Sequence, residues 1–261
     1  SESTTGISTA ENSMAEASAA ETSSSSSSSE TTDATASSSH ESPASTTEAS
    51  SSTTETSDAS TGSVILCGNG LIDGDEACDD GNQADFDGCS KTCTDEFLMF
   101  VTTAAFSPNF GDVAGADTLC QSAADGANLT GTYVAWVSVW DDNAWTDLPK
   151  GEPLIRRDGA TIVAKAEDLI QGQSTILQNP INLDQNGNPA TGYAWTGTHA
   201  QGLWQGWDCN NWTVHTTGSI GAIGNLNSTH QEWSLDNSPD PIEEIYCDST
   251  HHFYCFRAQS G

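Results

Sequence analysis

The chain of 261 residues contains 37 acidic residues against 6 lysines and arginines, which gives a formal net charge of -31 at pH 7. Phosphate recognition needs a basic surface, so this balance argues against nucleic acid as a partner and against an anionic membrane surface. No apolar run reaches the roughly 18 residues that a transmembrane segment needs.

Residues 1–63 form a Ser/Thr/Glu-rich segment in which Ser and Thr occupy 36 positions and Lys and Arg none. Such a segment cannot bury enough apolar surface to offset chain entropy, so we expect it to be disordered. We interpret it as a stalk that tethers the remainder to a cell envelope through its N-terminal side, with a plain spacer as the alternative. Because the sequence begins at Ser1, we also expect that a targeting segment has been removed or lies outside it.

All eight cysteines follow the stalk, at Cys67, Cys78, Cys89, Cys93, Cys120, Cys209, Cys247 and Cys255. An even set confined to the folded part is typical of a disulfide framework and of an oxidising compartment. Zinc is the alternative, but structural zinc sites use closely paired cysteines and only Cys89 and Cys93 are that close. The sequence therefore predicts disulfides and an exported protein.

Residues 64–96 form a four-cysteine module that is rich in Asp and Gly and too poor in aliphatic residues to build a hydrophobic core. Its sequence runs Cys67-Gly-Asn-Gly, then Gly-Asp-Glu-x-Cys78-Asp-Asp-Gly-Asn, then Asp-Gly-Cys89-Ser-x-x-Cys93. This pattern resembles the Myxococcus-type cysteine-rich repeat of exported bacterial proteins. We expect the four cysteines to pair among themselves, in an order that spacing leaves open.

The acidic residues of this module suggest a calcium site. Oxygen-bearing side chains recur at short intervals, and calcium takes six to eight oxygen ligands. The candidate ligands are Asp73, Asp75, Asp79, Asp80, Asn82, Asp85 and Asp87. The alternative is that Asp, Asn and Gly serve only as turn formers in a loop-rich module.

Residues 97–261 form a third segment, which contains all eight tryptophans. Apolar residues spaced three and four apart predict a helix over residues 111–127, and a second short helix is expected over 162–169. Strands are predicted over residues 97–103, 132–140, 193–196, 212–215 and 253–257. These elements, separated by Gly/Asn/Asp-rich loops, predict an α+β domain with few helices.

Several motifs of this segment are similar to one bacterial surface-protein family whose fold belongs with endostatin and the C-type-lectin-like domains. They are Phe100-Val-Thr-Thr, Gly115-Ala-Asp-x-x-Cys120-Gln, Gly131-Thr-Tyr-x-Ala-Trp136, Trp195-Thr-Gly, Cys209-x-x-Trp212, Trp233-Ser and Tyr254-Cys-Phe. The resemblance implies a C-type-lectin-like domain with nested disulfides, Cys120 with Cys255 outside and Cys209 with Cys247 inside. Spacing alone allows three connectivities and selects none.

The calcium-dependent sugar site of true C-type lectins is not expected here. Its Glu-Pro-Asn or Gln-Pro-Asp triplet has no counterpart between His199 and Asp208, and Glu152-Pro-Leu lies far too early. The fold that the resemblance implies therefore does not by itself establish lectin activity.

Five tryptophans lie in the loop-rich half of this domain. We expect Trp195, Trp212 and Trp233 to fill the core. Trp204 and Trp207, flanked by glycines, are predicted to be exposed and to bind a ligand together with Asp208, because amphipathic rings anchor sugars and protein partners.

No catalytic motif is apparent. Gly-x-Ser-x-Gly, His-Glu-x-x-His and a phosphate-binding glycine loop are absent, the histidines are isolated apart from His251 and His252, and Glu243-Glu244 is interpreted as surface charge. We therefore expect an extracellular or cell-surface binding or adhesion protein, with a bacterial outer-membrane lipoprotein as one form, that recognises a glycan or an extracellular protein without catalysis. The alternatives are a structural envelope protein with calcium-stabilised modules and, more weakly, a secreted hydrolase.

Overall fold

The computed structural model describes residues 66–172, 176–239 and 245–259. The chain divides into two compact units, Ser1–Asp58 and Ala59–Gly261, and all described residues belong to the second. The predicted stalk of residues 1–63 and the pair Glu243-Glu244 lie outside the described residues. Within them, no helix is both long enough and apolar enough to cross a bilayer.

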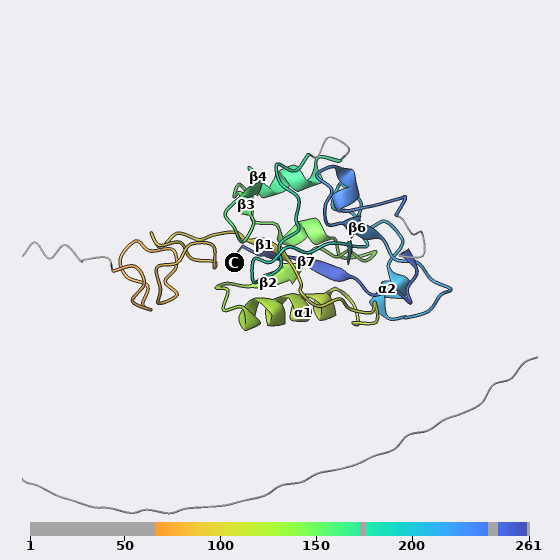
Figure 1. Ribbon diagram of the computed structural model, residues 1–261, viewed down its shortest axis with the longest axis horizontal. Helices are drawn as coiled ribbons and strands as arrows, with labels where there is room; N and C mark the ends of the chain where they lie inside the picture. Colours follow the sequence, from red (N-terminus) through yellow and green to blue (C-terminus); the bar gives the residue numbers. More distant parts are fainter. Residues whose placement is uncertain (1–65, 173–175, 240–244, 260–261) are drawn as a thin grey trace, which may run out of the picture. The chain divides into compact units, whose positions relative to one another are not determined.

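A five-stranded sheet organises the part that follows the cysteine-rich module (Figure 1). Its strands are β1 (Met99–Val101), β2 (Tyr133–Ala135), β5 (Tyr193–Trp195), β6 (Ile223–Asn225) and β7 (His252–Arg257). Strand β7 pairs antiparallel with β1 and β2 and parallel with β5, and β5 pairs antiparallel with β6. The last strand along the chain is therefore the centre of the sheet.

Helix α1 (Val113–Gly126) confirms the helix predicted over residues 111–127. The Asp112 carboxylate caps it by accepting from the backbone N–H of Val113, at 2.7 Å. The helix lies along one face of the sheet, against β2 and β7 (Figure 1). Its buried residues, Val113, Ala116, Cys120 and Ala124, are among those that the spacing selected. The domain is thus a mixed α+β structure.

The sheet separates two hydrophobic clusters, because successive residues of a strand face opposite sides. On β7, Phe253 and Cys255 join the cluster under α1, whereas Tyr254 and Phe256 join the cluster on the other face. The second cluster is covered by β3 (Leu154–Ile155), β4 (Thr161–Val163), the 3-10 turn η2 (Ala166–Ile170) and long loops. As predicted, Trp195, Trp212 and Trp233 are fully buried.

Three predicted elements are corrected. The short helix expected over residues 162–169 is strand β4 followed by the 3-10 turn η2. The strand expected over 132–140 ends at Ala135, because the residues that follow are buried on all sides and leave the sheet. The strand expected over 212–215 is absent, since Trp212 ends the short turn α2 (Cys209–Trp212).

Four disulfides confirm the expected covalent framework, and no described cysteine is free. Cys120 of α1 is bonded to Cys255 of β7, and Cys209 is bonded to Cys247. These are the two bridges that the family resemblance implies. In the module, Cys67 is bonded to Cys93 and Cys78 to Cys89, a choice that spacing had left open.

The cysteine-rich module is attached to the sheet through Arg257, whose exposed fraction is 4%. Its guanidinium donates to the Gly88 and Glu96 carbonyls and to the Asp95 carboxylate. Nearby, the Phe86 ring packs so closely over Gly159 that a Cβ there would lie 2.3 Å from the ring. Residues of the larger domain therefore form part of the interior of the module.

Candidate binding site

The predicted ligand-binding residues Trp204, Trp207 and Asp208 lie on one loop, but their roles differ. Trp204 is exposed and Trp207 is half-buried. Asp208 is buried, and its carboxylate accepts from Trp204 Nε1 at 2.9 Å and from the backbone N–H of Asn211 at 3.1 Å. Because both oxygens of Asp208 are engaged, this residue positions the Trp204 ring.

The turn that follows Asp208 has an unusual backbone. All four residues of α2 have positive φ, from 48° at Cys209 to 58° at Asn210, so the turn is left-handed. Residues other than glycine rarely adopt this backbone conformation, and it persists only where surrounding contacts impose it. Here the Cys209–Cys247 bridge and the Asp208 carboxylate impose it, which fixes the base of the Trp204 loop.

Two exposed tryptophans were missed by the sequence analysis. Trp140 is 65% exposed and Trp145 is 38% exposed, close to the 39% of Trp204. The backbone N–H of Trp204 donates to Asn143 Oδ1 at 2.9 Å, and a Cβ on Gly202 would lie 2.8 Å from the Trp145 Cβ. The loop between the two missed tryptophans thus packs directly against the Trp204 loop.

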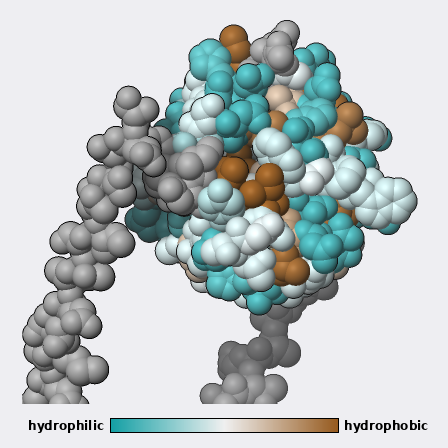
Figure 2. Space-filling view, turned by 90° about the vertical axis from the view of Figure 1, so that its right-hand side faces the viewer, coloured by the Kyte–Doolittle hydropathy of each residue, from teal (hydrophilic) through white to brown (hydrophobic). Residues whose placement is uncertain are grey.

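A pocket of about 380 Å³ opens beside these loops. Its described lining, which we call the loop pocket, consists of Gly172, His199, Ala200, Gln201, Gln231, Leu235 and Asn237. Three of these residues belong to the loop that carries Trp204. Figure 2 shows that on the face at the α2 and β6 end apolar residues form only small groups between hydrophilic ones, outside the part covered by grey atoms.

A buried hydroxyl network ties together the loops around the pocket. Thr198 Oγ1 donates to Ser138 Oγ or accepts from it at 2.8 Å, and Ser234 Oγ donates to the Thr198 carbonyl at 3.1 Å. Trp136 Nε1 donates to Ser234 Oγ, and the Ala144 N–H donates to Ser138 Oγ. Since buried polar networks of this kind fix a single arrangement, the loops that bear Trp145, Trp204 and the pocket are held in place before any ligand arrives.

Replacing Thr198 by Val should lower the free energy of unfolding by about 1–3 kcal/mol, because the isosteric methyl leaves buried partners without a hydrogen bond. Urea unfolding followed by tryptophan fluorescence measures this. Thr146→Val, at an exposed hydroxyl, is the matched control and should change the stability by less than about 0.5 kcal/mol. Equal effects of the two substitutions would contradict the role of the network.

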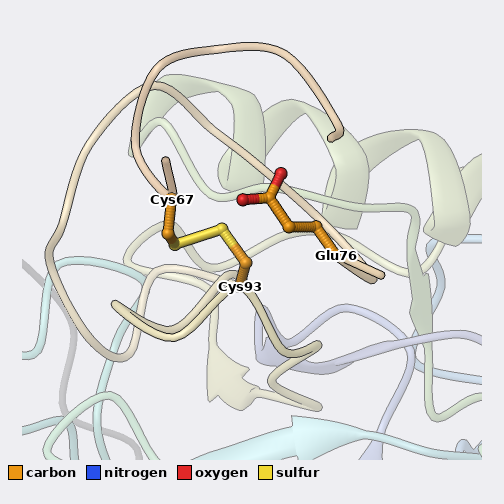
Figure 3. A group of neighbouring side chains, drawn as sticks. All are labelled: Cys67, Glu76 and Cys93. Carbon is orange, nitrogen blue, oxygen red and sulfur yellow. A yellow bond between two sulfur atoms is a disulfide. The ribbon is translucent and has the colours of Figure 1, made fainter. Parts of the chain in front are cut away.

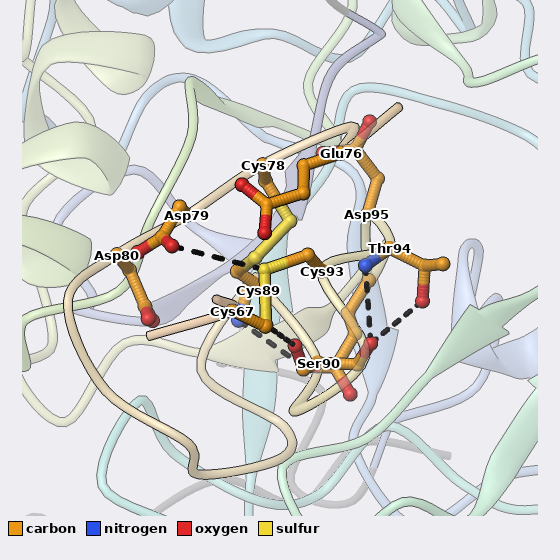
Figure 4. Close-up of a disulfide and its surroundings, with 12 residues drawn as sticks. Cys67, Glu76, Cys78, Asp79, Asp80, Cys89, Ser90, Cys93, Thr94 and Asp95 are labelled. Atoms are coloured by element: carbon orange, nitrogen blue, oxygen red, sulfur yellow. Dashed lines mark hydrogen bonds between the residues drawn. A yellow bond between two sulfur atoms is a disulfide. The ribbon is translucent and has the colours of Figure 1, made fainter. Parts of the chain in front are cut away.

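In the cysteine-rich module, the Asp79 carboxylate binds the backbone of the turns that contain Gly68, Gly70 and Gly81. It accepts backbone N–H groups of Gly68, Asn69, Gly70 and Gly81 at 2.8–3.1 Å. Burial opposes the charge of Asp79, but these donors outweigh it and lower the pKa of the carboxyl. Figure 4 shows the carboxylate beside the two disulfides, with Oδ2 lying 3.9 Å from Cys93 Sγ. Asp79 therefore joins the Cys67 and Cys78 loops.

The other predicted calcium ligands have separate contacts. Asp73 accepts from Asn69 Nδ2, and Asp85 pairs with Lys91 at 2.7 Å. Asn82 is different, because its backbone N–H donates to Asp80 Oδ1 and its Nδ2 donates to Asp87 Oδ2, both at 3.1 Å. No contact involving the Asp75 side chain is found within the described residues. The structure thus does not gather the seven predicted oxygens into one group.

Asp80 and Asp87 are the exception, because their carboxylates face each other. One oxygen of each is buried without a hydrogen-bond partner among the described residues. Desolvation, and after it the charge of Asp87, raises the pKa of Asp80 above its ordinary value. This pair, together with Asn82, which is hydrogen-bonded to both, is the part of the predicted calcium set that the fold brings together, and calcium binding here stays a prediction.

Replacing Asp80 by Asn should stabilise the protein at pH 7 in the presence of a chelator, by less than about 1 kcal/mol. A carboxyl whose pKa is raised on folding costs stability once pH exceeds the unfolded value of 3.8, so the gain should vanish below that pH. Thermal unfolding at pH 7 and pH 3 measures both. Destabilisation by the substitution at pH 7 in chelator would contradict the repulsion.

A group of three potential metal ligands, Cys67, Glu76 and Cys93, occurs in the module (Figure 3). The two sulfur atoms are bonded to each other in a disulfide, so neither is a thiolate that could hold a metal. Glu76 accepts from the Asp73 N–H at 2.8 Å, which stabilises the local turn. This group is therefore structural.

The histidines do not form a common site in the described part of the chain. His251 is buried against Trp195, with ring centroids 4.4 Å apart, and His252 Nδ1 contacts the Thr102 carbonyl. His215 Nε2 contacts the Asp248 carbonyl, whereas His199 lines the loop pocket. Of these four histidines, His199 is the one that lines the loop pocket.

Residues 58–94 match the family described as Domain of unknown function (DUF4215), which is a cysteine-rich, repeat-like domain. No curated relative matches the chain. The module that contains the Asp79 carboxylate and two of the four disulfides is thus similar to this family over residues 64–94.

Proposed function

We propose that the protein is an extracellular or cell-surface binding protein that recognises a glycan or a protein ligand without catalysis. The observation that carries the proposal is the pair of exposed rings, Trp145 and Trp204, on two loops that pack against each other, of which the Trp204 loop also lines a pocket. Amphipathic rings of this kind supply large contact areas with little loss of side-chain entropy.

The rigidity of these loops supports a binding role. The Ser/Thr network, the left-handed turn after Asp208 and the Cys209–Cys247 bridge all restrain the loops in the absence of a ligand. A preorganised surface loses less conformational entropy on binding, so more of the contact energy appears as affinity.

We further propose a C-type-lectin-like or endostatin-like fold for residues 97–261 and a Myxococcus-type repeat for the module. The nested pair of bridges and the sequence motifs around Cys120 and Cys255 support the first assignment. The assignment of the module is supported by Asp79 of the Cys-Asp-Asp-Gly-Asn motif, whose carboxylate accepts hydrogen bonds from two different loops. Disulfides also favour an oxidising, extracellular location.

Capture of ligands by the full chain tests the proposal, with immobilised glycans and extracellular proteins as separate arms. Trp204→Ala and Trp145→Ala should each reduce capture about tenfold or more, as expected for ring anchors. Leu71→Ala, at an apolar residue of the cysteine-rich module that is more exposed than either ring, is the control and should leave capture unchanged. The proposal would be overturned if neither tryptophan substitution altered capture, or if the protein captured no ligand in either arm.

A structural envelope protein is the second candidate, favoured by the facing Asp80 and Asp87 carboxylates, which suit a stabilising calcium ion. It predicts that calcium raises the thermal midpoint without any ligand. Hydrolysis has no comparable support, because the described lining of the loop pocket contains no carboxylate.

A further inference from the structure

The loop pocket is uncharged in its described lining, although the chain carries a net charge of -31. Three lining residues bear side-chain amides, Gln201, Gln231 and Asn237. Gly172 and Ala200 contribute little bulk, and Leu235 adds one apolar surface. The described lining therefore offers dipoles to a ligand.

These amides are free to bind. Among the described residues, the side chains of Gln201, Gln231 and Asn237 make no hydrogen bond. Each amide presents both a carbonyl acceptor and an NH₂ donor. A ligand that fills the pocket thus meets three unoccupied donor and acceptor pairs.

His199 adds a donor of defined orientation. Its Nδ1 accepts from the backbone N–H of Gln201 at 3.0 Å, so in the neutral ring the proton resides on Nε2. Desolvation lowers the pKa of His199 below its ordinary value, which disfavours the charged ring.

We propose that the loop pocket binds a neutral saccharide, an inference that rests on the proposed binding function and names its ligand class. Sugar hydroxyls donate and accept at once, as side-chain amides do, so the two sets of groups satisfy each other. The exposed Trp145 ring, which packs against Gly202 next to the lining residue Gln201, supplies an aromatic surface for the apolar face of a sugar.

Other ligand classes fit less well. An anion would find no Lys or Arg in the described lining and would be repelled by the net charge of the protein. An apolar ligand would bury the three amides without partners, and each such loss weakens binding. The volume of about 380 Å³ lies at the lower end of the range for small-molecule sites, roughly 300–1,000 Å³.

Saturation-transfer NMR and calorimetry on the full chain test the inference. The probes are glucose, galactose, mannose and N-acetylglucosamine, with N-acetylneuraminic acid as the anionic comparison. Gln231→Ala and Asn237→Ala should each raise the Kd of the bound neutral sugar about two- to tenfold, the loss expected for one hydrogen bond. Gln178→Ala, an exposed amide outside the pocket, is the matched control and should leave the Kd unchanged.

The outcomes separate this inference from the proposed function. Binding of a neutral sugar that only the pocket substitutions weaken supports it. Three results would overturn the saccharide inference while the proposed function stands. The first is sugar binding that the pocket substitutions leave unchanged, and the second is binding of N-acetylneuraminic acid alone. The third is the absence of sugar binding when the protein still captures a protein ligand through Trp204. Absence of all capture overturns both.

Discussion

Replacing Cys120 and Cys255 together by Ala is expected to lower the free energy of unfolding by about 5 kcal/mol. The bridge spans a sequence separation of 135 residues, and the entropy that a cross-link removes from the unfolded chain grows with that span. Both cysteines are fully buried between α1 and β7, so the substitution also removes packed sulfur atoms from the interior. Urea unfolding at 25 °C, followed by tryptophan fluorescence, measures the loss.

The Cys78–Cys89 bridge is the matched control. Its separation is only 11 residues, and the same relation gives about 3 kcal/mol for the corresponding double substitution. A loss for the short bridge that equals or exceeds that for the long one would contradict the entropic origin of the difference.

Replacing Arg257 by Met is expected to lower the free energy of unfolding by about 2–4 kcal/mol, because it leaves the buried carbonyls of Gly88 and Glu96 without their donor. Asp95, whose side chain is 34% exposed, can bind water instead. The Met side chain retains most of the packing against the Phe97 ring, whose centroid lies 5.6 Å from the guanidinium carbon. The effect therefore reports mainly the polar contacts. Thermal and urea unfolding both measure it.

Lys91→Met provides the comparison, since Lys91 forms an exposed ion pair with Asp85 and should contribute less than about 1 kcal/mol. A second readout is proteolysis between residues 66 and 96, which Arg257→Met should accelerate because the module loses its attachment to β7. Unchanged protection of the module with Arg257→Met would show that the attachment depends on other contacts.

The sequence was informative where one periodicity dominates a segment. Helix α1 could be predicted because its small and apolar residues recur on one face, and β7 because aromatic residues mark a buried strand. The prediction failed at Trp212, where an aromatic residue that is typical of a strand occupies a left-handed turn. Local propensity gave no sign of that turn, since the Asp208 carboxylate and a bridge to Cys247, distant in sequence, hold it.

The candidate site was only partly predictable. Glycines around Trp204 indicated exposure correctly, but nothing in the local sequence indicated that Trp145 is exposed or that it lies beside Gly202. The lining amides are ordinary surface residues in the sequence, and only the fold brings Gln201 and Gln231 to one pocket. Likewise, among the seven candidate calcium ligands, Asp80 and Asp87 are the two whose carboxylates face each other in the fold.

The position of β7 at the centre of the sheet has a consequence for biogenesis. Strands β1, β2 and β5 all emerge from the ribosome before His252–Arg257, yet each pairs with that segment. Until it arrives, Cys120 has no native partner and the apolar faces of α1 and the early strands stay uncovered. The native pairing of these strands therefore forms only after residues 252–257 have been synthesised, and the Cys120–Cys255 bridge cannot form before then.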